Sequence, residues 1–445
     1  YELFGIFQML TLITFIAVLG ILIFIHELGH YMAAKHVGVR VETFSIGFPP
    51  TIYGKKVGDT EYKVSWIPLG GYVRLFGQNV TDEDPTVPSN YASKSILQRI
   101  YILIGGPAMN LLFALFCMPL LYMIGVQSPA YLDEMAKLRK IDQGSIAEKI
   151  GLQANDQIFT VNGNEVLNWR AVNQEMGKAI TTSNLRLEVE RDGALLDFEV
   201  PLQELQQQRQ MGWKPFIEPR AGGFTSPSPA REAGLQEGDL ILSINGNSVT
   251  DWSDLIPLIQ ESQQPNGSSD AVQIIVEYER SGEVQFVELK PYFEKEAKLW
   301  LMGMSMPTQN KNYGIGESVS MGVQRVWQLT KATFMFLGQM LSGQGSLDDL
   351  GGPIRIGMVL GDAAKSGISN LIFLMAFISL QLGIFNLLPI PALDGGHILL
   401  LGFEKLKGAP LSTIFRERSQ MIGFSVLIAL MLFVTWNDLI QLFRA

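Results

Sequence analysis

Four long, uncharged runs of apolar residues constrain the fold of this chain more than any other feature. They lie at residues 7–25, 100–126, 366–393 and 419–437. A helix needs about 20 apolar residues to cross the ~30 Å hydrocarbon core of a bilayer, and each run is about that long or longer. The sequence therefore predicts a multi-pass α-helical membrane protein with four transmembrane helices. Its 17% of charged residues also indicates a sizeable part outside the lipid.

A fifth segment, residues 318–341, is a weaker candidate for a span because Arg325 and Lys331 interrupt it. Val319 and Val323 recur at the spacing of one helix face. We expect an amphipathic helix on the membrane or protein surface here, with a fifth span as the alternative.

The charged residues between the runs predict how the chain is oriented. Residues 31–99 hold eight Lys or Arg side chains and residues 401–418 hold four, and both loops lie on one side of a four-helix protein. Positively charged loops face the cytoplasm. Residues 131–311, with 27 acidic and 17 basic side chains, then lie in the periplasm of a bacterial inner-membrane protein. A net charge of −9 without a basic stripe argues against nucleic acid as a partner.

A metal-binding motif, His26-Glu27-Leu28-Gly29-His30, ends the first apolar run. Positions i and i+4 of a helix share one face, so the two histidines can hold one metal ion. Glu27 beside them can take a proton from water. Ionisable residues at membrane depth cost roughly 2.5–3.5 kcal/mol each and are functional by default. The motif therefore predicts a zinc-dependent peptide hydrolase at or within the membrane, near its cytoplasmic side.

A catalytic zinc site also needs a third protein ligand and one open position. The single cysteine, Cys117, lies in an apolar run, which excludes a cysteine-based site. Near its end the third run contains Pro389 and Pro391, which break a helix. Asp394 directly follows the run. A carboxylate there is costly unless it binds a cation, so we expect Asp394 to be the third zinc ligand. The alternative role for Asp394 is a helix-end cap.

Several further residues are candidates for substrate binding. Asn386 can hydrogen-bond the substrate backbone or the developing oxyanion, or else another helix. Pro389 and Pro391 belong to the same broken helix end. Asn110 lies in the second run, where it either contacts the substrate or helps the helices to pack.

The loop after the first run has β character. Tyr62, Val64 and Trp66 alternate with polar residues, and Gly70-Gly71 precedes another short apolar stretch. We expect hairpin strands close to the metal site, with an edge able to pair with an extended substrate. Unpaired backbone cannot face lipid, so such a sheet enters the membrane only where protein or water covers it. The alternative is a plain cytoplasmic hairpin.

Residues 127–311 contain an internal repeat with an offset of 83 residues. Its matching positions are Gly151-Leu152, Asp156 and Asn162-Gly163, followed by Gly234-Leu235, Asp239 and Asn245-Gly246. Each Asn-Gly pair follows an alternating apolar stretch, as a hairpin turn does. The repeats resemble PDZ domains, which implies two α+β modules whose grooves accept an added strand. We expect them either to capture peptides or to act as a size filter without a ligand.

Three motifs together resemble those of the site-2 protease family. They are His26-Glu27-Leu28-Gly29-His30, Gly106-Pro107-Ala108-Met109-Asn110, and the stretch that runs from Asn386 through Pro389 to Asp394-Gly395. The resemblance covers nearly the whole chain and implies an intramembrane zinc metalloprotease of the M50 type. Members of this family cleave transmembrane segments of single-pass proteins after an upstream site-1-type protease has trimmed them. Their substrates include anti-sigma factors of envelope stress signalling and remnant signal peptides.

The expected organisation of the chain follows from these elements. We expect residues 1–36 to form the first transmembrane helix, 37–95 a cytoplasmic or membrane-reentrant β-hairpin region, 96–126 the second transmembrane helix, 127–221 and 222–311 two tandem PDZ-like domains, 312–365 an amphipathic surface helix and linker, 366–400 the third transmembrane helix, and 401–445 a cytoplasmic loop and the fourth transmembrane helix.

Two other hypotheses remain open. One is a membrane-anchored PDZ scaffold with a structural or degenerate metal site, and the other is a different membrane-embedded zinc hydrolase. A structural zinc normally has four protein ligands, whereas this sequence offers three with a general base beside them, which favours the protease.

Overall fold

The computed structural model describes residues 2–78, 87–179, 185–208, 210–225, 227–263, 271–294, 297–343 and 351–444. The chain divides into two compact units, residues 1–126 with 312–445, and residues 127–311. The limits of the second unit coincide with those expected for the two repeats together. We call the first the helical unit and the second the repeat unit.

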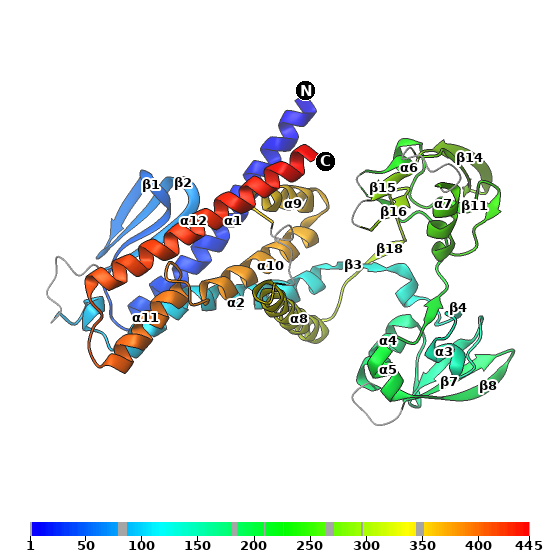
Figure 1. Ribbon diagram of the computed structural model, residues 1–445, viewed down its shortest axis with the longest axis horizontal. Coiled ribbons are helices and arrows are strands. Elements are labelled where there is room, and N and C mark those ends of the chain that lie inside the picture. Colours follow the sequence, from blue (N-terminus) through cyan, green and yellow to red (C-terminus); the bar gives the residue numbers. More distant parts are fainter. Residues whose placement is uncertain are drawn as a thin grey trace. The chain divides into compact units, whose positions relative to one another are not determined.

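Four helices of the helical unit are long and apolar enough to cross a membrane, as predicted. They are α1 (Glu2–His36), α2 (Ile96–Ile124), α10 (Ile368–Asn386) and α12 (Thr413–Arg444). α2 packs against both α1 and α10 and therefore lies at the centre of this unit (Figure 1). A Cβ on Gly105 of α2 would lie 2.6 Å from the Gly29 carbonyl oxygen, so these glycines let α1 and α2 touch backbone to backbone.

Three more α-helices of the helical unit lie among the described residues. α8 (Ile315–Leu341) packs along α2, with Ser318 and Val326 buried and with Val319, Val323 and Trp327 exposed. It is one continuous helix and is not among the described helices that are long and apolar enough to cross a membrane, and its role as an amphipathic surface helix stays a prediction. No pattern in the sequence predicted α9 (Pro353–Lys365), which packs against α1, or α11 (Asp394–Lys407) as separate helices.

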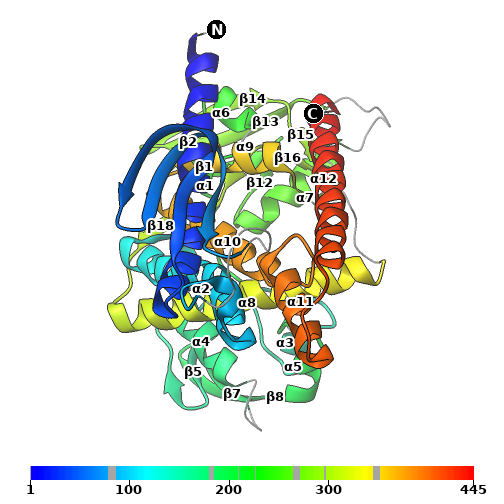
Figure 2. The ribbon, with the colours of Figure 1, turned by 90° about the vertical axis from the view of Figure 1, so that its left-hand side faces the viewer.

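The expected hairpin is longer than predicted and folds back on itself. β1 (Val41–Val57) and β2 (Thr60–Leu75) pair antiparallel, with irregular register where both strands bend. Phe44 pairs with Val73 on one side and with Tyr62 on the other. The two long strands thus form a sheet of four short segments in the order 71–75, 41–46, 60–64 and 51–57. This sheet lies alongside α1, and its 71–75 segment is an edge (Figure 2).

The repeat unit contains two modules with matching four-stranded sheets. The first sheet has the order β6-β5-β7-β8 and the second β12-β11-β13-β14. Each module has its own apolar core and one longer helix, α4 (Trp169–Ala179) or α7 (Leu255–Gln263). The sheet strands are β5 (Gln157–Val161), β6 (Asn164–Glu165), β7 (Leu185–Arg191), β8 (Ala194–Val200), β11 (Leu240–Ile244), β12 (Asn247–Ser248), β13 (Ile274–Arg280) and β14 (Glu283–Leu289).

Shorter elements complete both units. The helices are α3 (Ile146–Lys149), α5 (Leu202–Gln208), α6 (Pro229–Glu232) and the 3-10 turns Tyr91–Ser93, Ala130–Asp133 and Trp252–Asp254. The strands are β3 (Val126–Pro129), β4 (Leu138–Ile141), β9 (Trp213–Pro215), β10 (Gly223–Phe224), β15 (Tyr292–Glu294), β16 (Leu299–Leu301), β17 (Met304–Ser305) and β18 (Thr308–Lys311).

The repeated residues explain why the modules match. Asn162 and Asn245 both have φ of 51°, and the glycine after each also has positive φ. Two successive positive φ values define the type I′ turn that suits a tight hairpin, and Asn-Gly is the pair that adopts it most readily. The buried Asp156 and Asp239 each accept two hydrogen bonds from an arginine of the third sheet strand, at 2.6 and 2.7 Å.

Candidate metal centre

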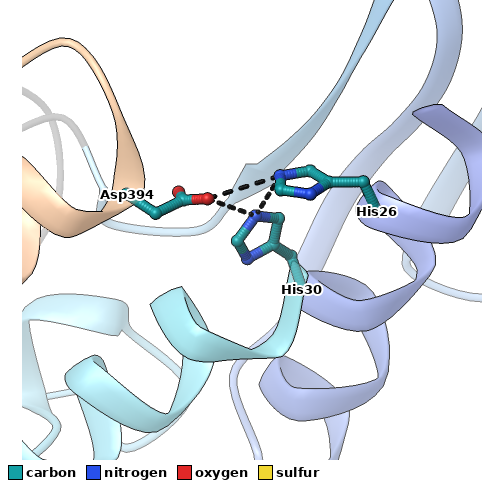
Figure 3. Close-up of side chains that lie close together, drawn as sticks. All are labelled: His26, His30 and Asp394. Carbon is teal, nitrogen blue, oxygen red and sulfur yellow. Dashed lines mark hydrogen bonds and ion pairs between the residues drawn. The ribbon is translucent and has the colours of Figure 1, made fainter. Parts of the chain in front are cut away.

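The two histidines of the motif lie one helical turn apart near the end of α1 and point to the same side (Figure 3). Their Nε2 atoms are 3.1 Å apart, and their rings meet edge to face. The helix continues through the motif to His36, so its i and i+4 positions are set by regular α-helical geometry.

The third side chain of the centre comes from the other end of the chain. α10 ends at Asn386, a loop with two prolines follows, and α11 begins at Asp394. The Oδ2 atom of Asp394 lies 3.3 Å from Nε2 of His26 and 3.5 Å from Nε2 of His30. The predicted break in the third apolar helix is therefore present, and Asp394 is the first residue of a new helix.

These distances fit a zinc ion. Zinc binds histidine nitrogen and carboxylate oxygen at about 2.0–2.2 Å, so two ligands of a tetrahedral site lie about 3.3 Å apart. The three donor atoms are separated by 3.1, 3.3 and 3.5 Å. Among the described residues they form the one such group of His, Cys, Asp or Glu. Three protein ligands leave a fourth position open, as in catalytic rather than structural sites.

Neighbouring residues of α2 hold the imidazoles in place. His30 Nδ1 is 2.9 Å from the carbonyl oxygen of Ile102, to which it can donate a hydrogen bond and so leave Nε2 free for a metal. A Cβ on Gly106 would overlap Nε2 of His30 and would lie 2.8 Å from Nε2 of His26. A residue without a side chain is therefore required at position 106.

The charge of Asp394 suits a metal ligand. Burial alone would raise the pKa of its carboxyl, but the contacts with His26 and His30 hold that pKa below its usual range. The carboxylate is therefore ionised at neutral pH. His397, three residues later, is also buried, and its burial lowers its pKa, so this imidazole is neutral.

A cavity of about 300 Å³ opens beside the three donors. Glu27 lines it, and the backbone of Val73 in the edge strand of the sheet interacts with the Glu27 carboxylate. A Cβ on Gly71 of the same strand would lie 3.1 Å from Cγ of Glu27. The cavity therefore brings together the metal ligands, a candidate base and a strand edge.

The residues expected to bind substrate fall into two groups. Asn386 and Gly71 line the cavity. The other group consists of residues that are not among the lining residues, namely Asn110, Pro389, Pro391, Tyr62, Val64, Trp66 and Gly70.

The second group has other surroundings. Asn110 contacts His26 from α2. Tyr62 shares a hydrogen bond of 2.8 Å with Tyr31. Val64 is paired with strand segments on both sides, so its backbone is not at an edge. Trp66 is 67% exposed, and Gly70 lies against the Phe48 ring.

The cavity also contains residues that the sequence analysis did not single out. Tyr91 lines it, and burial raises the pKa of its phenol to about 12, so the phenol stays neutral. Leu103 of α2 and Gln78 line it as well. These residues belong to no spacing pattern, and their approach to the motif depends on contacts between distant parts of the chain.

Comparisons with known proteins point to one peptidase family. The profile of peptidase family M50 matches residues 14–430. A regulator of sigma E protease from Haemophilus influenzae is 34% identical, with 96% of this chain and 98% of the relative covered. The regulator of sigma-E protease RseP from Escherichia coli is 33% identical, with 97% and 98% covered. A relative from Pasteurella multocida that is named as a zinc metalloprotease is 31% identical, with 96% and 98% covered.

Among solved structures, a PDZ domain from Listeria monocytogenes matches 21% of this chain and 92% of its own. The TM-score is 0.17 at 17% identity, a likeness too low to assign the fold of the repeats.

Proposed function

The chain belongs to peptidase family M50 and is a zinc metalloprotease, and we propose that it hydrolyses peptide bonds within transmembrane segments of single-pass membrane proteins. The observation that carries this proposal is the position of the motif. His26, Glu27 and His30 all lie within the candidate membrane span Thr11–His36. A hydrolytic centre on such a helix meets its substrate at membrane depth.

The proposed roles of the site residues follow from the geometry described above. His26, His30 and Asp394 hold the zinc ion. Zinc, when bound, acts as a Lewis acid toward the attacking water and the scissile carbonyl. The Glu27 carboxylate takes the proton from the attacking water and delivers it to the leaving amine nitrogen. Asn386, at the end of α10, donates its amide to the substrate backbone or to the developing oxyanion.

The substrate has to be extended where it is cut. Carbonyl groups within a helix are already hydrogen-bonded and are covered by side chains. The 71–75 edge of the sheet lines the cavity and can pair with an unwound segment through main-chain hydrogen bonds. Helix-breaking residues in a substrate would therefore favour cleavage.

We place this activity in regulated proteolysis at the bacterial inner membrane, in sigma-E-type signalling. The names of the relatives from Haemophilus and Escherichia support that setting. The substrates would be of the anti-sigma-factor type, trimmed first by another protease, with remnant signal peptides as a further class. The acidic repeat unit would consist of two PDZ-like domains in the periplasm that exclude substrates with a bulky outer part.

The decisive experiment uses Glu27→Gln in purified full-length protein with a transmembrane test peptide. The variant should keep its zinc and lose cleavage, because an amide cannot accept the proton. Glu61→Gln, in an exposed ion pair of the sheet, is the matched control and should cleave normally. Cleavage by Glu27→Gln at the wild-type rate would remove Glu27 from the mechanism.

A further inference from the structure

Asn110 is a fully buried polar residue in the middle of α2. Its side chain is 0% exposed, and its Nδ2 atom lies 3.2 Å from Nδ1 of His26. Its Oδ1 atom is also buried and has no hydrogen-bond partner among the described residues. A buried amide oxygen without a partner is costly and calls for an explanation.

The explanation lies in the proton that a metal-bound histidine carries. A neutral imidazole that offers Nε2 to a metal has its proton on Nδ1, and this N–H needs an acceptor. For His30 the acceptor is the carbonyl oxygen of Ile102. For His26 the neighbouring atom is the amide nitrogen of Asn110, which is itself a donor. Two donors would then face each other while the amide oxygen has no partner.

We propose that Asn110 is a positioning residue of the metal centre and that its amide oxygen accepts the Nδ1 proton of His26. A half-turn of the amide exchanges Oδ1 and Nδ2, which have nearly the same shape. The oxygen then faces the imidazole, so a hydrogen bond replaces a contact between two donors, and the amide nitrogen takes the buried position that Oδ1 held. The lone pair of His26 Nε2 points to the metal. The inference rests on the proposed ligand set, and it gives Asn110 a role other than contact with the substrate.

The backbone of Asn110 is held by a contact that does not involve its amide side chain. Its backbone oxygen accepts a hydrogen bond of 2.9 Å from Ser379 of α10, which is also fully buried. Both imidazoles are thus oriented from α2, His30 by Ile102 and His26 by Asn110, which lies about two turns further along the helix. Orienting partners of this kind contribute about 10–100-fold to metal affinity.

The test compares Asn110→Leu, Asn110→Asp and wild type in full-length protein, with zinc alone as the probe and a competing chelator as the readout. Asn110→Leu keeps the shape but removes the acceptor, and it should bind zinc about 10–100-fold more weakly. Asn110→Asp keeps an acceptor and should bind at least as tightly as the wild type. Equal affinity of Asn110→Leu and wild type would overturn the proposal, as would an Asn110→Asp variant as weak as Asn110→Leu.

Ser379→Ala is the control for a merely structural effect. It removes the other hydrogen bond of Asn110 without touching the imidazole, so it should lower thermal stability but leave zinc affinity unchanged. If Asn110→Leu does not fold, Asn110→Asp decides alone, because a tenfold loss of affinity there contradicts the proposal. Cleavage of the test peptide is measured separately. A wild type that binds zinc without cleaving would overturn the proposed function only, whereas one that binds no zinc would overturn both.

Discussion

At the scale of single residues, the metal centre depends on the missing side chain of Gly106 as much as on the three side chains that offer donor atoms. The grouping of His26 with His30 could be predicted from residue type and spacing, since the two must share a helix face. The need for glycine at position 106 could not, because it arises from the approach of α2 to both imidazoles. The contact between Asn110 and His26 could not be predicted either, because the two residues are 84 positions apart in the sequence.

Gly106→Ala tests whether the metal centre requires a residue without a side chain at position 106. The added methyl group would overlap both imidazoles, and overpacking of this kind costs about 1–3 kcal/mol, so zinc affinity should fall about tenfold or more. Chelator competition measures the change. Gly20→Ala is the control on α1, because nothing lies within 4 Å of a Cβ there, and it should bind zinc normally. Wild-type zinc affinity in Gly106→Ala would contradict this prediction, because it would mean that the imidazoles can move aside without losing the metal.

At the scale of elements, α11 decides where Asp394 lies. The sequence predicted the break after the third apolar run because prolines cannot continue a helix. It did not predict that a new helix starts at Asp394, nor that the hairpin folds into four segments. Both depend on contacts between distant parts of the chain. α11 is held by Glu404, which is 3% exposed and forms ion pairs with Arg99 of α2 and Arg416 of α12.

Glu404→Ala should therefore disturb the metal centre without touching it. Removing one partner of a buried ion pair costs about 3–5 kcal/mol, because it leaves a buried charge without compensation. Here the largely buried guanidinium of Arg99 would lose its carboxylate partner, and α11 would lose its ion pair with α2. Thermal unfolding and zinc content of the purified protein are the measurements. Lys405→Ala, next in the chain and exposed, should change neither. A stable Glu404→Ala variant with full zinc content would mean that other contacts position α11.

At the scale of the whole molecule, the proposed catalytic residues and the repeats belong to separate units. All residues of the metal centre lie in the helical unit. The two points where the chain leaves and re-enters this unit are close together, since Tyr313 N donates to Tyr122 O at 3.1 Å. The repeat in the sequence and the four apolar runs were enough to predict this division, because each reflects composition rather than contacts.

Replacing residues 127–311 by a short flexible linker tests the separation of roles. The ends are close enough for such a linker, so the helical unit should fold and cleave a small transmembrane test peptide as well as the full chain does. A substrate with a bulky outer domain should be cut faster than by the full chain. A shortened protein that binds zinc but cleaves nothing would contradict the filter role of the repeats.

We propose that side chains from the two ends of the chain enclose one zinc ion at membrane depth. X-ray absorption at the zinc edge, together with metal analysis, tests it in wild type and in Asp394→Ala. We expect one zinc per chain in the wild type, with nitrogen and oxygen ligands at about 2.0–2.2 Å, two of which are imidazoles. We expect Asp394→Ala to lose the zinc. An Asp394→Ala protein with a full zinc complement and an unchanged ligand shell would contradict it.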